Sequence, residues 1–214
     1  MTRRILFLCG MLSPLVYVFM TILGGTLRPD YSHSYHAVSE LMEAGAPNKW
    51  LLDILLSLSD ILGILFGCGV LFLVFSRKVK RGVGLAGSSC LIAIGILELI
   101  VALFFPMDPR HATPTFAGLM HLFLVGVLSI LSVLTPFIFA AWLKHQTDFT
   151  GYGVYSLISA LLILLTGAFA AVTVFYESTL IGLAERVTVG VYLQWTFFLA
   201  LKMYTISKQR FIAK

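Results

Sequence analysis

Long apolar runs alternate with short polar links along this chain of 214 residues. Six runs reach the length of about 20 residues that a helix needs to cross a bilayer, and they are Ile5–Gly25, Leu51–Phe75, Val83–Phe105, Pro114–Leu143, Tyr152–Phe175 and Glu185–Tyr204. A backbone within hydrocarbon must satisfy its own hydrogen bonds, so these runs are expected to be helices. The pattern predicts an all-α fold, an integral membrane bundle of six transmembrane helices that forms a single domain over residues 1–214.

Composition supports a membrane protein and excludes an ordinary soluble domain. The chain is 59% hydrophobic and 12% charged, whereas soluble domains are about half apolar and about a quarter charged. The formal net charge of +5 does not indicate nucleic-acid binding, because the basic residues are scattered at segment ends. The three cysteines all lie within apolar runs, without disulfide or zinc-type spacing, and are interpreted as small packing residues.

The distribution of charge predicts the orientation. Eleven of the fifteen Lys and Arg residues fall at the two termini or in links on the same side as the termini. By the positive-inside rule that side is cytoplasmic, which places both termini inside the cell and the protein in the inner (plasma) membrane. The first run is interpreted as an uncleaved span, since it is longer than a signal-peptide core. Most acids and four of the five histidines fall on the opposite, outer half.

The longest outer link, Thr26–Trp50, is expected to be ordered. Its stretch SYHAVSELMEAGAP predicts a short helix resting on the outer mouth of the bundle. Ser34 can cap the start of this helix, Gly45 suits the left-handed position just past its end, and Pro47 stops it.

Ionisable residues also occur inside the spans. The helix over 114–143 is expected to start with Thr113 as its cap, so that His121 lies about 10 Å deep, level with Glu98 on the preceding span. Asp60 shares a helical face with Asp53 and lies slightly deeper in the membrane than Glu98. A charge at the bilayer centre costs at least ~2.5 kcal/mol on insertion scales, so a functional site is the default interpretation. The alternative is a hydrogen-bonded knot that fixes helix packing.

Metal binding is a further possibility raised by the outer histidines. A Zn²⁺ ion would draw on His36, Asp108 and His121, since imidazole and carboxylate are zinc ligands. No H-E-x-x-H motif or cysteine ligand set is present. A solvated, titrating surface is the other interpretation, and it is favoured for His33 and His111.

The start of the last run places Glu185 and Arg186 side by side at the outer boundary. An acid at a helix N-terminus is favoured by the helix dipole, which accounts for Glu185. Arg186 is expected to pair with Asp108 or Glu40, and the alternative is that it holds a phosphate or carboxylate of a ligand.

Several motifs together resemble a known family. They are Ser13-Pro14, Arg28-Pro29-x-Tyr31, Ser39-Glu40 with Ala46-Pro47, Phe105-Pro106-x-Asp108, His121 and Glu185-Arg186. Over nearly its whole length the chain resembles the multi-pass family called domain of unknown function 998. The resemblance implies six helices and directs attention to the polar residues within those motifs, and it implies no reaction.

The predicted site is an outward-facing polar pocket to which separate spans contribute. Its candidate residues are Ser39, Glu40, Asp60, Glu98, Asp108, His121 and Arg186. The leading hypothesis is that this pocket binds a small ligand or a lipid headgroup, because no nucleophile motif accompanies the acids. The expected partners are membrane lipid or a small molecule, and not nucleic acid.

Two other hypotheses use the same residues. One is a membrane-embedded hydrolase, with or without a metal, that acts on lipid at the outer leaflet. In it Glu40 or Glu98 is the general base, and Ser39 as a nucleophile is a variant. The other is a scaffold or assembly factor in which every polar group is structural.

Overall fold

The computed structural model describes residues 2–212, with side chains from residue 3 to residue 209. Every regular element within this range is helical, which confirms the all-α prediction. The long helices are α1 (Thr2–Leu27), α2 (Lys49–Phe75), α3 (Arg81–Phe104), α4 (Phe116–Leu143), α5 (Tyr152–Phe175) and α6 (Ile181–Ile212). Two short 3-10 helices, η1 (Ser39–Met42) and η2 (Thr147–Phe149), lie in the links. Lys214 and the side chain of Arg210, both counted as basic residues near the C-terminus, lie outside the described residues.

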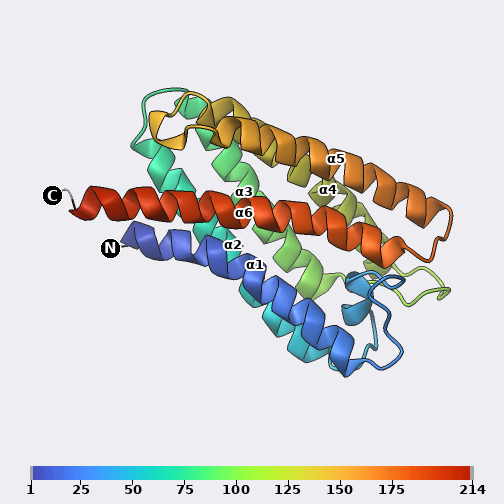
Figure 1. Ribbon diagram of the computed structural model, residues 1–214. Helices are drawn as coiled ribbons and strands as arrows, with labels where there is room; N and C mark the ends of the chain where they lie inside the picture. The colour runs from blue at the N-terminus through green and yellow to red at the C-terminus, as the bar shows by residue number, and fades with distance from the viewer. Residues whose placement is uncertain (1, 213–214) are drawn as a thin grey trace.

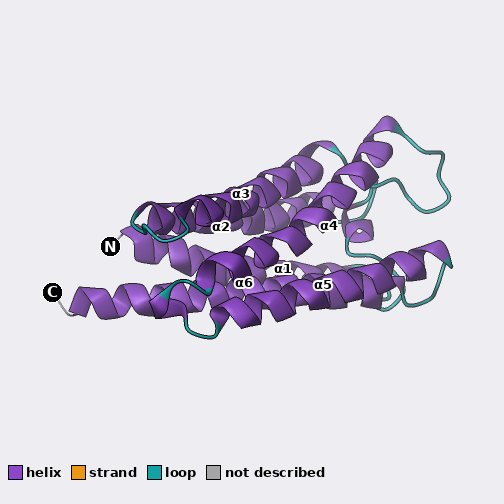
Figure 2. Cartoon of the chain, turned by 90° about the horizontal axis from the view of Figure 1, so that it is seen from above, coloured by secondary structure: helices purple, strands orange, loops and turns teal. Residues whose placement is uncertain are grey.

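The long helices form a closed ring in chain order. Each packs mainly against its neighbours in sequence, and α1 closes the ring by packing against α6. Both ends of the chain lie at one end of the bundle, called here the terminal end (Figure 1). The opposite end, called here the loop end, carries the longer links, as Figure 2 shows. α1 and α6 lie close together near the terminal end and separate toward the loop end (Figure 1).

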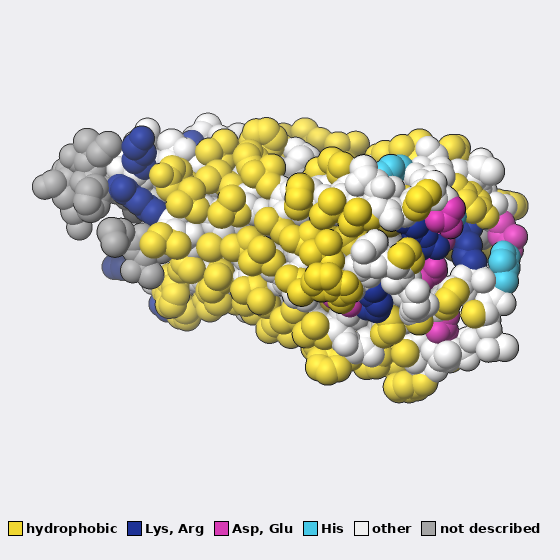
Figure 3. Space-filling view, turned by 90° about the horizontal axis from the view of Figure 1, so that it is seen from below, with side chains coloured by type: hydrophobic (Ala, Val, Ile, Leu, Met, Phe, Trp, Pro, Cys, Tyr) yellow, Lys and Arg dark blue, Asp and Glu magenta, His cyan; other side chains and the backbone are white. Residues whose placement is uncertain are grey.

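Five helices, α1 to α5, are long and apolar enough to cross a membrane. α6 is the longest at 32 residues but does not meet that criterion, because Glu185, Arg186 and Lys202 interrupt its apolar sequence. Large apolar side chains such as Leu165 and Phe123 are exposed on the outside of the ring. Figure 3 shows this apolar surface in the middle of the molecule, with Lys and Arg at the terminal end and charges of both signs at the loop end. These features are those of a multi-pass membrane protein.

The buried interior has two apolar clusters separated by a polar level. The larger cluster, around Phe66, Trp142 and Trp195, fills the half near the terminal end. The smaller cluster, around Met20 and Leu41, lies under the loop-end link. On α2, the residues between the two clusters include Ser57, Ser59 and Asp60.

The link from Arg28 to Asn48, called here the cap segment, differs from its prediction. The expected short helix is a single 3-10 turn, and Ser34 does not start it. Side chains from other elements bind the backbone of this segment, and they replace the hydrogen bonds that a helix would have made. Gly45 does adopt the predicted left-handed conformation, with φ of 82°.

The start of α4 also differs from its prediction, by one half-turn of helix. Thr115, not Thr113, is the cap residue, and its side chain accepts a hydrogen bond from the backbone N–H of Gly118. The physical reason lies in Asp108, which accepts hydrogen bonds from both the backbone N–H and the hydroxyl of Thr115 and so fixes Thr115 in place.

Candidate functional site

The structure distributes the seven candidate residues over three places. Ser39, Glu40 and Arg186 contact the cap segment or belong to it. Asp108 and His121 lie at the corner between α3 and α4. Asp60 is buried on α2, and Glu98 is half-buried on the neighbouring helix α3.

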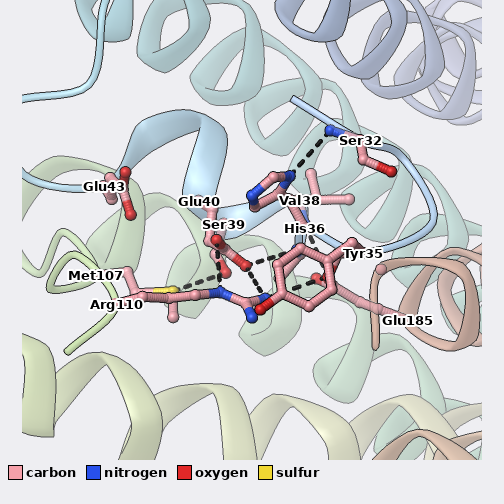
Figure 4. A network of polar contacts seen from close by, with 12 residues as sticks. Ser32, Tyr35, His36, Val38, Ser39, Glu40, Glu43, Met107, Arg110 and Glu185 are labelled. Carbon is pink, nitrogen blue, oxygen red and sulfur yellow. Dashed lines mark hydrogen bonds and ion pairs between the residues drawn. The ribbon is translucent and has the colours of Figure 1, made fainter. Parts of the chain in front are cut away.

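The cap segment is held by a buried ion pair between Glu40 and Arg110. Glu40 is only 2% exposed. Its carboxylate accepts hydrogen bonds from Arg110 Nε at 2.9 Å and Arg110 Nη2 at 2.7 Å, and from the backbone N–H of Ala37 at 2.8 Å. The guanidinium of Arg110 also lies over the ring of Tyr35, 4.2 Å from its centroid (Figure 4). The hydrogen bonds that Arg110 donates to the Glu40 carboxylate raise the pKa of Arg110 above its usual value.

Arg186 anchors the cap segment to α6. Its Nη1 donates to the carbonyl oxygens of His33 and His36 at 2.9 and 2.8 Å, and its Nη2 donates to the hydroxyl of Tyr31. The predicted pairing of Arg186 with Asp108 or Glu40 is wrong, because those acids are bonded to Thr115 and Arg110. Burial raises the pKa of Tyr31 to about 12, although Arg186 opposes the shift. Burial, with the charge of Arg186, lowers the pKa of His33.

Other side chains complete the attachment of the cap segment. Arg28 donates to the carbonyl oxygen of Glu40 at 2.7 Å and to the carboxylate of Glu43 at 3.0 Å. Glu185 accepts from the backbone N–H of Val38 at 2.8 Å. The hydroxyl of Ser39 donates a hydrogen bond to the sulfur of Met107 at 3.1 Å, and no histidine is hydrogen-bonded to it among the described residues. Figure 4 shows Ser39, Met107 and Glu185 around the short turn that holds Glu40.

The α3–α4 corner contains Asp108 and His121. Asp108 binds Thr115 at 2.8 Å through each of its two oxygens. The Nδ1 atom of His121 is 2.8 Å from the carbonyl oxygen of Phe105, the residue that follows α3. These bonds join the end of α3 to the start of α4. No hydrogen bond among the described residues joins His121 to Glu98, the residue that the sequence places at the same depth.

The carboxyl groups of Asp60 and Glu98 lie apart from the cap segment and from the α3–α4 corner. Asp60 is 3% exposed, and its Oδ2 atom is buried without a hydrogen-bond partner among the described residues. The buried Oγ of Ser57, one turn away on α2, also has none. Glu98 lies within electrostatic range of Asp60, and of Tyr17 and Tyr192 on α1 and α6.

The three residues considered as zinc ligands, His36, Asp108 and His121, are not gathered at one point. Among residues 2–212, no group of three or more His, Cys, Asp or Glu side chains lies close enough together to hold a metal ion. The Nδ1 atom of His36 accepts a hydrogen bond from the backbone N–H of Ser32 at 2.9 Å, within the cap segment. His36 and the α3–α4 corner therefore belong to separate places in the structure.

A cavity of ≈ 310 Å³ lies between α1, α6 and the cap segment. Its lining residues are Tyr17, Val18, Thr21, Ile22, His33, Val38, Arg186, Val189, Gly190 and Leu193. Arg186 is the one candidate site residue in this lining. The α1 residues of the lining all follow Pro14, the proline inside that helix. A proline bends a helix, and α1 separates from α6 toward the loop end (Figure 1).

Two features of the sequence correspond to this cavity. Pro14 predicts a bend in the first helix, and Gly190 leaves out a side chain in the apolar run of the last helix. A Cβ atom at Gly190 would meet nothing within 4 Å. What the sequence does not show is that the first and last helices are neighbours.

Comparison with known proteins gives one match. The model of a family described as "Protein of unknown function (DUF998)" matches residues 11–202, a range that begins within α1 and ends within α6. No curated protein and no solved structure matches the chain. The range includes the cap segment, the α3–α4 corner and the interior carboxyl groups, and all the motifs that suggested the resemblance. The chain therefore belongs to the DUF998 family of proteins of unknown function.

Proposed function

We propose that this protein binds a membrane lipid with an anionic headgroup in the cavity between α1 and α6. The observation that carries the proposal is the composition of the cavity lining, which joins an apolar wall to a guanidinium group. An amphiphile needs both features, one for its chains and one for its head.

The apolar part of the lining is reached from the side of the bundle. Val18 and Ile22, on α1, are 46% and 57% exposed on the surface that would face lipid. Val189 and Leu193 of α6 line the opposite wall. An acyl chain can enter between the two helices without crossing a polar surface.

The polar part of the lining favours a negative charge. Arg186 and His33 lie in the lining, and no Asp or Glu side chain does. The Nε atom of Arg186 is buried and has no hydrogen-bond partner among the described residues. The guanidinium charge of Arg186 favours an anionic group in the cavity, because charge-assisted bonds from guanidinium to phosphate are among the stronger hydrogen bonds.

In the proposed arrangement all six long helices cross the membrane, with the terminal end in the cytoplasm. The concentration of Lys and Arg at that end supports this orientation. The cavity then opens at the level of the outer leaflet of the plasma membrane.

A test of the proposal uses two glycines. Gly190 lines the cavity and Gly126 lies on the lipid-exposed surface of α4, and a Cβ atom at either position meets nothing within 4 Å. Gly190→Leu should fill the cavity without disturbing the fold, while Gly126→Leu serves as the matched control. Native mass spectrometry would measure the lipid retained by each variant, purified from bilayers that contain anionic and zwitterionic phospholipids.

The wild type and Gly126→Leu are expected to retain the anionic phospholipid in preference to the zwitterionic one, by about tenfold. Gly190→Leu is expected to lose that retention with an unchanged unfolding temperature. Equal retention by the two leucine variants, or no preference for the anionic lipid in the wild type, would refute the proposal.

A further inference from the structure

We propose that Asp60 and Glu98 form a binding site for one monovalent cation, a proton or Na⁺, enclosed within the helix ring. This site is separate from the lipid cavity and does not depend on the function proposed for it.

Close packing of α2 against α3 fixes the relative height of the two carboxyl groups. A Cβ atom at Gly67 would lie 3.2 Å from the backbone nitrogen of Ile92, and one at Gly95 would lie 3.1 Å from the carbonyl oxygen of Asp60. The two backbones are therefore nearly in contact at these points. Glu98 follows Gly95 by three residues and so lies on the same face of α3, toward the turn of α2 that holds Ser57 and Asp60.

Two buried polar atoms beside this contact between α2 and α3 lack hydrogen-bond partners. Asp60 Oδ2 and Ser57 Oγ are both buried without a hydrogen bond among the described residues. Asp60 as a whole is 97% buried, since its exposed fraction is 3%. A buried carboxylate oxygen without a donor is costly, and a native structure normally supplies a proton, a water or an ion in such a position.

No basic side chain offsets the two acids. Among the described residues, the ion pairs of Lys and Arg involve Asp30, Glu40, Glu43, Asp53 and Asp148, and neither Asp60 nor Glu98. The titratable groups that face Glu98 from α1 and α6 are Tyr17 and Tyr192, which carry no positive charge. His121 of α4 is bonded to Phe105 instead. Two adjacent carboxylates in an apolar bundle repel each other, and one bound cation removes that repulsion.

The polar groups at this level suit a small cation. The carboxyl oxygens and the Ser57 hydroxyl are hard oxygen donors of the kind that bind Na⁺, and a shared proton needs only the two carboxyl groups. No group of three or more His, Cys, Asp or Glu side chains gathers here among the described residues, so the place does not suit a transition metal.

The experiment compares the wild type with Asp60→Asn and Glu98→Gln, which are nearly isosteric and remove one charge each. Asp53→Asn is the matched control, because Asp53 is on the same helix but is paired with Lys49 at 2.6 Å. The unfolding temperature is measured between about pH 6 and about pH 9, with either Na⁺ or the large cation N-methylglucamine as the only monovalent cation. Infrared spectra of the same samples report the carbonyl stretch of protonated carboxyl groups.

If the cation is a proton, the native state holds a proton that the unfolded chain has released, so stability must fall as the pH rises. The unfolding temperature should then fall by at least about 4 °C over this range in N-methylglucamine. The protonated-carboxyl band of the wild type should change in both test variants and not in Asp53→Asn. If the cation is Na⁺, this ion should raise the unfolding temperature of the wild type and Asp53→Asn at high pH, and not that of the test variants.

The proposal is overturned by a wild type that shows neither a protonated carboxyl band nor a response to Na⁺. It is also overturned if Asp60→Asn and Glu98→Gln respond to pH and Na⁺ just as Asp53→Asn does. These two wild-type measurements test the proposal even where a variant fails to fold.

Discussion

At the scale of single residues, charged side chains at the loop end bind backbone groups of the cap segment as often as they bind each other. Arg28 and Arg186 donate to carbonyl oxygens of this segment, and Glu185 accepts from one of its N–H groups. The segment has only one short 3-10 turn of its own, so its backbone polar groups must find partners elsewhere. The side chains therefore have a structural role in closing the loop end, whatever the cavity beneath them binds.

The Glu40–Arg110 pair gives a prediction at this scale. Replacing Glu40 with Ala removes the three bonds that its carboxylate accepts and leaves the Arg110 guanidinium without its acid. We expect a loss of about 3 kcal/mol in the free energy of unfolding, because breaking a buried pair from one side leaves an uncompensated charge. Denaturant unfolding of the protein in detergent micelles measures this loss in the free energy of unfolding.

The control for this prediction is Asp30→Asn. The side chain of Asp30 is 77% exposed and contacts Arg28 at 3.6 Å, so its loss should cost less than about 1 kcal/mol. A Glu40→Ala protein as stable as this control would show that the ion pair does not hold the cap segment.

At the scale of elements, the boundaries of the helices are set by local side chains that compete for the backbone. The start of α4 is the clearest case. Thr113 precedes a proline, which makes it a reasonable cap in the sequence, yet Thr115 makes the capping bond. Asp108 selects Thr115 by binding its N–H and its hydroxyl. Gly118 allows this arrangement, since a Cβ atom there would collide with the carboxylate of Asp108.

The two threonines give a matched pair for testing the start of α4. Thr115→Ala removes the side-chain acceptor for Gly118 N–H and one of the bonds to Asp108, so it should reduce stability by about 1 kcal/mol. Thr113→Ala, at an exposed position, should change it by less than about 0.5 kcal/mol. Thermal unfolding followed by circular dichroism compares them, and a reversed order would contradict the assignment of Thr115 as the cap.

At the scale of the whole molecule, ring closure determines where the polar level and the cavity lie. α1 and α6, the first and last helices, meet as neighbours, and the cavity lies where they separate. The interior carboxyl groups lie between the apolar cluster of the terminal half and the smaller cluster under the cap segment. The even number of long helices brings both termini to one end (Figure 1).

The proposed orientation can be tested with two single-cysteine substitutions in intact cells. Asp30 at the loop end and Lys78 at the terminal end are both exposed, whereas the native cysteines are buried or partly buried. A membrane-impermeant maleimide should label Asp30→Cys from outside, and Lys78→Cys only after the membrane is permeabilised. The opposite pattern would reverse the orientation, and labelling of both from outside would mean that α2, the helix between them, does not cross the membrane.

The sequence by itself determined the helices and the depth of the polar residues. The six long helices begin and end within a few residues of the predicted runs, except that α6 extends further in both directions. The prediction of the helices succeeds because an apolar run of bilayer length leaves its backbone no alternative to internal hydrogen bonds. The tertiary structure alone decided which side chains meet. Arg110 rather than Arg186 pairs with Glu40, and Glu98 lies near Asp60 while His121 bonds to Phe105. Depth follows from counting residues along a helix, whereas contact depends on how each helix is rotated and on the path of the cap segment, and these are set by packing between elements distant in sequence.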